Sequence, residues 1–465
     1  MECPIRRIAL LHHTGLGNLG DDAVVKGVIS NIGKRWENAQ FTLISMNPLD
    51  SEKRHGLPCY PIRQYQLGYG LDPSAFNPIQ ERQGWFRTWL RRTRNPAIRI
   101  PRGIVGELRF LKKSYDFIKS FDSLIVTGGG QLTERGGPLS FPYALFIWSL
   151  LAKRAGVKFM LLSIGAGPLN LRLSRFLVLR TLRRADYVSF RDQESRDLVR
   201  SLGFAGPAAV CPDNVYSLQE VPATAKTSAE RIVGIAPMPF PFDDLARYPQ
   251  NAQEIRDSLV KRMAAFASLV ANMAFSLVLF GSDVRSDPPE IERLRTALLN
   301  RNGIALPEYL PHNSISELLN RMSDMDYVVT CRLHGVVFAH ILNKPVLAIS
   351  HHPKVTHLMK ALGLSEYCVE MVDFDPIQLA EKFQSLVANT ESVKEKMAMK
   401  LAEYRAQSAA QFDSVFPPGA SVARELKTAS VNSAGSAIAE SMRDCACRCE
   451  DSRNEGNSLV NKRLF

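Results

Sequence analysis

The chain alternates between short apolar runs, typical of buried strands, and longer segments with apolar residues at helical spacing. The first pair is a strand at 5–11 followed by a helix whose apolar face carries Val24, Val28 and Ile32. Further strands are predicted at 41–45, 123–127, 158–163, 187–190, 232–236, 275–281, 328–330 and 345–349. Because strands and helices alternate in both halves, we predict an α/β protein with two Rossmann-like, doubly wound domains that face each other.

Breaks in this pattern give the domain boundaries. A polar connector at 221–230 divides the halves, so the N-terminal domain is placed at 1–222 and the C-terminal domain at 223–417. A long helix ending near residue 409 is expected to close the second domain. Residues 418–465 turn to Ser, Ala, Asn and scattered charge, which predicts a disordered C-terminal tail.

Residues 60–115 interrupt the pattern with a basic insertion. Its arginines lie between Arg82 and Arg109, interleaved with Trp85 and Trp89, and the whole chain has a formal net charge of +12. Three interpretations remain open: a solvated face, a groove for single-stranded nucleic acid, and a surface that contacts anionic membrane head groups. No nucleic-acid-binding motif accompanies the run, so no nucleic acid partner is expected.

The apolar segments also bear on location. The first apolar run spans only 8–11 with no small-residue cleavage site, and the longest stretch, 141–152, is too short for a bilayer. We therefore expect a cytoplasmic protein, with any membrane contact peripheral and at the inner face. Cys445, Cys447 and Cys449 cluster in the tail, but no His or second Cys pair lies at ligand spacing, so no metal is predicted there.

Residues suited to substrate chemistry follow the predicted strands, whose carboxyl ends line the ligand crevice in open parallel sheets. The clearest case is the run RLHG at 332–335. Arg332 offers a planar fork of donors for a carboxylate or phosphate, and His334 can move a proton near neutral pH. The alternative is that Arg332 pairs with a nearby Asp and that His334 caps the following helix.

Glycine-rich turns follow two strands of the first half. The three glycines at 128–130 would let backbone N–H groups approach a ligand. Residues 15–20 formally match G-x-G-x-x-G, but the second strand ends without a carboxylate for a ribose, and Asp21 and Asp22 would repel a pyrophosphate. We interpret Asn18 and Asp21 as polar groups for a hydroxylated ligand, with an Asp cap on the helix as the alternative.

Several of these motifs occur together in one order. They are GNLGDD, TGGGQL, GAGP, RDQES, PDN, RLHG, PVLAIS and a final lysine, Lys354. In this series the chain resembles the polysaccharide pyruvyl transferase family over about residues 8–365, and only the basic insertion and the tail fall outside the resemblance. One departure is that family members often carry a Tyr shortly before the Lys, where this chain has His351-His352.

The resemblance implies a two-domain, GT-B-like fold and an enzyme that transfers a pyruvyl group from phosphoenolpyruvate to a sugar of an exopolysaccharide or cell-surface glycan, forming a ketal. The acceptor would be a sugar or a lipid-linked oligosaccharide. Bidentate arginines suit the phosphate and carboxylate of this donor, and His334 is the candidate acid. Neither a cofactor nor a metal is expected, because the arginines supply positive charge.

The predicted site residues fall into three groups. The catalytic residues are His334, Arg332 and Arg191. The donor-binding residues are Arg332, Arg191, Lys354 and Gly335. The acceptor-binding residues are Asn18, Asp21, Gly128, Gly129 and Gly130.

Two other functions remain open. One is a GT-B-type glycosyltransferase with a nucleotide-sugar donor, although no clear carboxylate is placed to bind the ribose of such a donor. The other is a non-catalytic protein that binds sugar or nucleic acid, which only the net charge favours.

Overall fold

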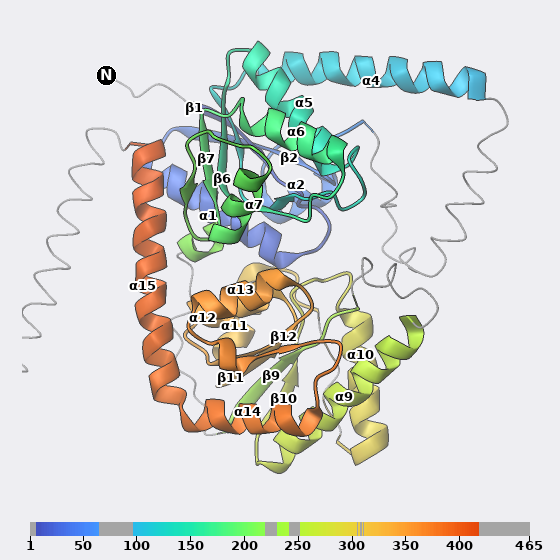
Figure 1. Ribbon diagram of the computed structural model, residues 1–465, viewed down its shortest axis with the longest axis vertical. Helices are drawn as coiled ribbons and strands as arrows, with labels where there is room; N and C mark the ends of the chain where they lie inside the picture. The colour runs from blue at the N-terminus through green and yellow to red at the C-terminus, as the bar shows by residue number, and fades with distance from the viewer. Residues whose placement is uncertain are drawn as a thin grey trace, which may run out of the picture.

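The computed structural model of the chain describes residues 6–64, 96–218, 230–240, 252–304, 306, 309 and 311–417. Within these ranges the chain forms two α/β domains, one above the other in Figure 1. The predicted disordered tail lies outside the described residues, as do 65–95 of the basic insertion and 219–229 at the expected domain boundary.

The first domain is built on a parallel sheet with strand order β3-β2-β1-β4-β6-β7-β8, and β5 pairs with β6. Its strands are β1 (Arg6–Leu11), β2 (Ala39–Ser45), β3 (Cys59–Pro61), β4 (Ser123–Val126), β5 (Gly129–Leu132), β6 (Lys158–Ala166), β7 (Tyr187–Phe190) and β8 (Ala209–Val210). Its helices are α1 (Leu19–Arg35), α2 (Pro48–His55), α4 (Pro96–Ile118), α5 (Phe141–Arg154), α6 (Arg172–Leu182), α7 (Gln193–Ser201) and the short 3-10 helix η2 (Asn214–Ser217).

The central strand β1 explains why its sequence is apolar without alternation. Ile8 and Leu10 pack into a cluster on one face of the sheet, whereas Ala9 and Leu11 pack into a second cluster on the other face. A strand covered on both faces needs apolar residues at every position, which is the pattern of parallel sheets between helix layers.

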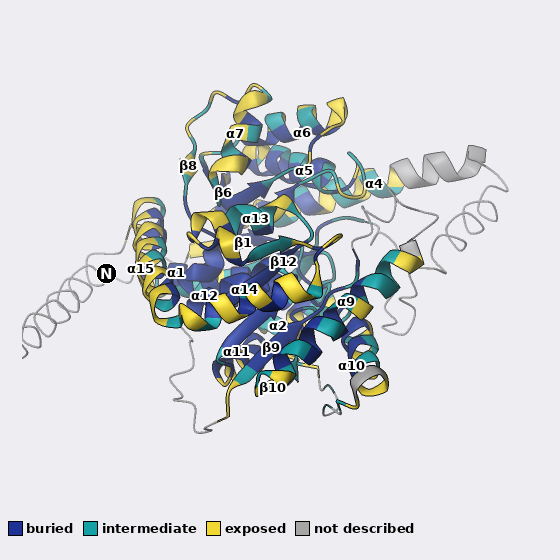
Figure 2. Cartoon of the chain, turned by 60° about the horizontal axis from the view of Figure 1, so that its bottom comes forward, coloured by how far each residue is buried: buried dark blue, intermediate teal, exposed yellow. Residues whose placement is uncertain are grey.

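The second domain has a parallel sheet with strand order β10-β9-β11-β12-β13. Its strands are β9 (Ile232–Ala236), β10 (Ser276–Leu279), β11 (Tyr327–Thr330), β12 (Val346–Ser350) and β13 (Cys368–Glu370). Its helices are α9 (Ala252–Asn272), α10 (Pro288–Asn302), α11 (Ile315–Ser323), α12 (Leu333–Ile341), α13 (Pro353–Ala361), η3 (Ser365–Tyr367), α14 (Pro376–Ala388) and α15 (Thr390–Val415). Figure 2 shows the buried strands inside a shell of helices, with exposed outer faces on α14 and α15.

The predicted α/β order is confirmed, and the predicted strands at 187–190 and 232–236 coincide with β7 and β9. The expected long closing helix is present as α15, which runs through residue 409 and follows the shorter helices α13 and α14. One detail differs. The predicted glycine turn after 127 contains strand β5, because Gly129 pairs with Ile164 of the longer strand β6.

Helix α15 connects the two domains. It begins at Thr390 in the second domain and ends beside the first (Figure 1). Phe412 and Phe416 complete the cluster that contains Ile8 and Leu10 of β1. Residues 412–416 therefore belong to the core of the first domain, although they follow the whole of the second domain in sequence.

The order of strands predicts where ligands bind. In the first sheet the direction of the strand order changes between β1 and β4, and in the second sheet between β9 and β11. Ligands of open α/β sheets bind outside the carboxyl ends of the strands at such switch points. These ends carry His12 after β1, Gly128 after β4 and Arg332 after β11.

Among the residues described, no helix is both long and apolar enough to cross a lipid bilayer.

Candidate functional site

The glycine-rich turn before α1 forms a junction between the domains. The backbone N–H of Leu19 donates to the carbonyl of Ser282 at 2.9 Å, and the N–H of Val284 donates to the carbonyl of Gly17 at 2.9 Å. Gly17 has φ +89°, and a Cβ there would lie 2.8 Å from the Arg285 side chain. The glycines at 15–20 therefore allow the second domain to approach closely. This use of the glycines agrees with the sequence argument against a dinucleotide site.

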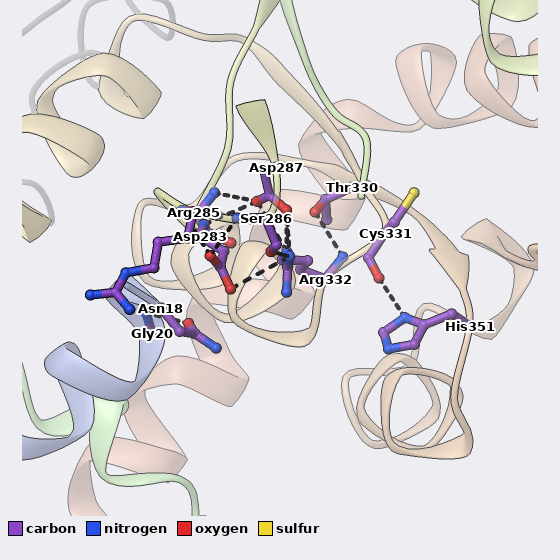
Figure 3. Close-up of polar contacts among 11 residues, drawn as sticks. Asn18, Gly20, Asp283, Arg285, Ser286, Asp287, Thr330, Cys331, Arg332 and His351 are labelled. Carbon is purple, nitrogen blue, oxygen red and sulfur yellow. Dashed lines mark hydrogen bonds and ion pairs between the residues drawn. The ribbon is translucent and has the colours of Figure 1, made fainter. Parts of the chain in front are cut away.

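Arg332 is held by the loop at this junction (Figure 3). Its Nε donates to both carboxylate oxygens of Asp287 at 2.8 and 3.0 Å, and its Nη2 donates to Ser286 Oγ at 2.6 Å. Nη2 also lies 3.7 Å from Asp283 Oδ2. The pairing of Arg332 with a nearby Asp, which the sequence left open, is thus present. Among the described residues these contacts occupy Nε and Nη2, which leaves Nη1 as the nitrogen that can bind a donor.

Asp287 organises the loop that Arg332 contacts. Its side chain is fully buried, and its Oδ2 accepts from the backbone N–H groups of Ser282 and Asp283 at 3.0 Å each. Burial raises the pKa of Asp287, although Arg332 opposes the shift. Arg332 is therefore connected through Asp287 to the backbone that pairs with the first domain.

His334 lies in the first turn of α12 and contacts the first domain. A Cβ at Gly20 would lie 1.9 Å from His334 Nδ1, so only a glycine fits at this position of α1. Nε2 of His334 lies 4.0 Å from Oδ2 of Asp213. Burial lowers the pKa of His334, while Asp213 and Asp21 act in the opposite direction. The N-cap residue of α12 is Arg332, and its side chain makes no capping hydrogen bond. His334 lies inside the helix, so the alternative in which His334 caps it is wrong.

Arg191 reaches the same region from the carboxyl end of β7. Its Nε lies 3.1 Å from Asp192 Oδ2, and its Nη1 lies 3.7 Å from Asp213 Oδ2. A Cβ at Gly165 would lie 2.7 Å from the guanidinium carbon, so the GAGP motif leaves room for Arg191. Asp213 Oδ2 has no hydrogen-bond partner among the described residues and lies between Arg191 and His334.

Lys354 adds positive charge from the first turn of α13. Burial, together with the nearby cations Arg191, Arg135 and Arg332, lowers its pKa to about 8 against the influence of Asp21. Like charges that depress a lysine pKa must lie close to it. The facing ends of the domains therefore concentrate cations from both sheets, which favours a ligand with several negative charges.

The two histidines that precede Lys354 closely, His351 and His352, interact with the backbone. His351 Nδ1 donates to the carbonyl of Cys331 at 2.9 Å (Figure 3), and burial and Lys354 lower its pKa to about 3. The neutral ring thus connects the ends of β11 and β12. His352 caps α13, accepting from the backbone N–H of Lys354 at 3.2 Å.

The predicted acceptor residues lie on the first domain. Asn18 is the N-cap of α1, with its side chain accepting from Gly20 N at 2.9 Å, so the cap is an Asn and not the Asp considered from the sequence. Asp21 Oδ2 lies 3.0 Å from His13 Nε2. Although burial opposes the shift, His13 and His12 lower the pKa of Asp21 well below its ordinary value. Asp22 points elsewhere, with its Oδ1 3.2 Å from His55 Nε2.

The four predicted glycines differ in what they contact. Gly128 and Gly129 have φ values of +106° and +74°. Gly130 is exposed, with nothing within 4 Å of an added Cβ, so its backbone is open to a ligand. Gly335 has a packing role, because a Cβ there would lie 2.2 Å from Thr330 Oγ1.

Three residues of this region were not predicted as site residues. Asp213 faces His334, and the adjacent His12 and His13 lie beside Asp21. Burial and His13 lower the pKa of His12 well below its ordinary value. His12 and His13 directly follow the predicted strand at 5–11, and Asp213 follows β8, so strand ends give the same signal here as at Arg332. Asp213 also lies within the PDN motif.

The structure is a protein of two facing α/β domains whose strand ends bring together cations, histidines and carboxylates. A sequence model of the family described as polysaccharide pyruvyl transferase matches residues 18–353. The chain belongs to the polysaccharide pyruvyl transferase family, which confirms the resemblance, and it is an enzyme of polysaccharide biosynthesis. It is 19% identical over 435 residues to the amylovoran biosynthesis protein AmsJ of Erwinia amylovora, covering 86% of this chain and 96% of that protein.

Solved structures support the fold. A putative UDP-N-acetylglucosamine 2-epimerase from Listeria monocytogenes is similar with a TM-score of 0.53 at 13% identity, covering 88% of this chain and 94% of that chain. The UDP-GlcNAc 2-epimerase from Neisseria meningitidis has a TM-score of 0.51 at 12% identity, covering 88% and 99%. These neighbours are of the GT-B type, so the predicted GT-B-like fold is confirmed.

Proposed function

We propose that the protein transfers a pyruvyl group from phosphoenolpyruvate to a sugar of an exopolysaccharide or cell-surface glycan and closes a cyclic ketal. The observation that carries this proposal is the cluster of Arg191, Lys354 and Arg332 at the facing ends of the domains, where Arg191 and Lys354 also act on His334. Phosphoenolpyruvate carries a phosphate and a carboxylate on a small skeleton. A compact group of cations next to one proton donor matches that pattern of charge.

The donor is placed between the domains. Lys354 and Nη1 of Arg332 come from the second domain, and Arg191 comes from the first. Binding a polyanion here offsets the repulsion that lowers the pKa of Lys354. Because the cations belong to different domains, the donor would also stabilise the closed arrangement.

His334 is the proposed acid. Transfer of its proton to the methylene carbon of the donor leaves a cationic centre at the adjacent carbon, which a sugar hydroxyl attacks with loss of its proton. The carbon–oxygen bond to phosphate then breaks, and a second hydroxyl of the same sugar takes the place of phosphate and closes the ketal. Asp213, which faces Nε2, favours the protonated ring that this step requires.

The acceptor is assigned to the first domain. Asp21, kept ionised by its histidine neighbours, can accept a hydrogen bond from a sugar hydroxyl. The exposed backbone of Gly130 and the turn at Gly128 and Gly129 lie after the neighbouring strand β4. Asn18 has its Oδ1 occupied by the helix cap, which leaves its amide group for the acceptor.

The second candidate is a glycosyltransferase that uses a nucleotide-sugar donor, because the same cations would suit a diphosphate. The two reactions release different products. We expect the purified protein to release inorganic phosphate from phosphoenolpyruvate only when an acceptor glycan is present, and to gain the mass of a pyruvyl ketal on that glycan. Release of a nucleoside diphosphate from a sugar nucleotide, with no phosphate from phosphoenolpyruvate, would establish the second candidate instead.

We further propose that the enzyme works in the cytoplasm on a lipid-linked acceptor at the inner membrane face. The basic run between Arg82 and Arg109 lies mostly outside the described residues. Helix α6, which is described, also combines apolar and basic side chains on its surface. Leu173, Phe176 and Arg180 are exposed there at helical spacing. Apolar side chains beside arginines suit the head-group region of anionic lipid.

A further inference from the structure

Two adjacent histidines and an aspartate meet at the carboxyl end of β1. His12 and His13 directly follow the strand, and Asp21 lies in the first turn of α1. Nε2 of His13 is 3.0 Å from Oδ2 of Asp21, and the two imidazole rings stack with centroids 4.3 Å apart. One nitrogen or oxygen from each side chain lies within 4.8 Å of the other two.

His12 distinguishes this group from an ordinary ion pair. Its side chain is fully buried, and neither ring nitrogen has a hydrogen-bond partner among the described residues. Buried polar groups are normally paired, so an unpaired imidazole beside a second imidazole and a carboxylate points to a ligand. Gly129 leaves space at this position, since a Cβ there would lie 3.0 Å from His12 Nε2.

We propose that His12, His13 and Asp21 bind a divalent transition-metal cation, with zinc as the best match. Two imidazoles and one carboxylate form a ligand set that zinc uses, whereas calcium and magnesium prefer oxygen ligands. At metal–ligand distances of about 2.1 Å, ligand atoms in a tetrahedral site lie roughly 3.4 Å apart. Small side-chain rotations would bring the three atoms to that spacing. Three protein ligands leave a fourth position open, as in catalytic zinc sites.

The position of this cation suggests its role, which rests on the proposed function. The three ligands lie at the switch point of the first sheet, next to the turn assigned to the acceptor. A sugar hydroxyl in the fourth position would be oriented, and its pKa would fall. The sequence led us to expect no metal because arginines supply the charge at the donor. The proposed cation would serve the acceptor instead.

Two alternative explanations place no cation at this cluster. Asp21 and His13 could form a dyad that accepts the proton of a sugar hydroxyl directly, with His12 as a neutral buried ring beside it. Alternatively, any bound metal could belong to the cysteines of the tail. The experiment must therefore separate this cluster from the tail and must measure binding as well as activity.

Zinc binding is measured by equilibrium dialysis on the full chain in which Cys445, Cys447 and Cys449 are replaced by Ser. We expect one zinc ion per chain. His12→Gln and Asp21→Asn should each weaken binding by at least about tenfold, since both remove a ligand. His357→Gln, which removes a histidine whose side chain is 40% exposed outside the cluster, is the matched control and should not change binding. Melting curves confirm that each variant is folded.

Cobalt provides a second readout that does not depend on turnover. Cobalt bound by nitrogen and oxygen should show visible absorption bands without thiolate charge-transfer bands, and His12→Gln should abolish them. Loss of all zinc binding in the Cys→Ser protein, or unchanged affinity in both His12→Gln and Asp21→Asn, would overturn the site. The zinc and cobalt measurements contain no phosphoenolpyruvate. If phosphoenolpyruvate failed to release phosphate, the proposed function would be lost, but the binding result would stand.

The role at the acceptor is tested separately by kinetics. Removing zinc should raise the KM for the acceptor by at least about tenfold while leaving the KM for phosphoenolpyruvate nearly unchanged. Restoration by added zinc in the parent protein, and not in His12→Gln, would support the role. Equal acceptor KM values with and without zinc would overturn it and favour the metal-free dyad.

Discussion

Nε2 of His334 lies 4.0 Å from Oδ2 of Asp213, and the two side chains come from different domains. This pair predicts a pH dependence. Burial lowers the pKa of His334, so the protonated acid is the minor form near neutral pH, and kcat/KM should rise as the pH falls toward that pKa. Asp213→Asn removes an influence that raises this pKa, so the whole profile should move to lower pH. An unmoved profile would mean that Asp213 does not act on the titrating group.

His334→Asn keeps much of the size of the side chain but loses the transferable proton. Turnover should fall by about 10² to 10⁴, the usual contribution of a general acid. Melting temperature should change little, because the buried Nε2 has no hydrogen-bond partner among the described residues that the substitution could remove. Turnover within about threefold of the parent protein would assign His334 a structural role.

Arg332→Lys should lower both stability and turnover. A single ammonium cannot reproduce the fork that binds Asp287 and Ser286, and weakening a buried pair of this kind costs up to roughly 3 to 5 kcal/mol. The double variant Arg332→Met, Asp287→Asn removes both charges of the pair and should be more stable than Arg332→Met alone. Turnover should stay low if Nη1 binds the donor. Recovery of turnover in the double variant would limit Arg332 to holding the loop.

Lys354 predicts a second pH effect, at the donor. Its pKa of about 8 means that it loses its charge as the pH rises through 8, so kcat/KM for phosphoenolpyruvate should fall above that pH. Lys354→Arg keeps the charge at higher pH and should move this fall upward. Lys354→Met should raise the donor KM at every pH. An unchanged alkaline limb in Lys354→Arg would assign the fall to another group.

Gly20→Ala tests the contact between α1 and α12. The added methyl would lie 1.9 Å from His334 Nδ1, so either the ring or the helix must move, and turnover should fall at least tenfold. Gly33→Ala is the matched control in the same helix, because nothing lies within 4 Å of its added Cβ. That control should be as active as the parent protein and slightly more stable. Equal activity of both variants would show that the position of His334 is not critical.

Membrane contact is tested with vesicles that contain anionic lipid. The parent protein should bind at low ionic strength and detach as salt rises. Replacing Arg87, Arg91, Arg92 and Arg94 by Gln should abolish binding, since each contributes on the order of 1 kcal/mol near the surface. Turnover on a soluble acceptor should stay unchanged. Loss of that turnover with vesicle binding intact would place these arginines at the active site.

The sequence predicted the parts of the site that depend on strand ends. Arg191 and Lys354 each follow a strand, and the topology of parallel sheets brings such positions together. The partner of Arg332 could not be identified, because Asp287 is 45 residues away and reaches it through an irregular loop after β10. His12 was missed because a histidine after a strand has no local signal that distinguishes a buried ring from a ligand. Gly20 makes room for His334 of the other domain. No local sequence pattern connects these two positions, so this role could not be predicted.

The return of α15 to the first domain has a consequence for synthesis. Domains usually fold from the N-terminus as the chain leaves the ribosome. Here the layer over Ile8 and Leu10 is completed by Phe412 and Phe416, which are made after the entire second domain. Arg35 also waits for its partner Asp413, 2.7 Å away in the finished protein. Helix α1 already covers part of this face, but the cover stays incomplete until the last helix emerges, and the apolar surface left open during that interval favours aggregation.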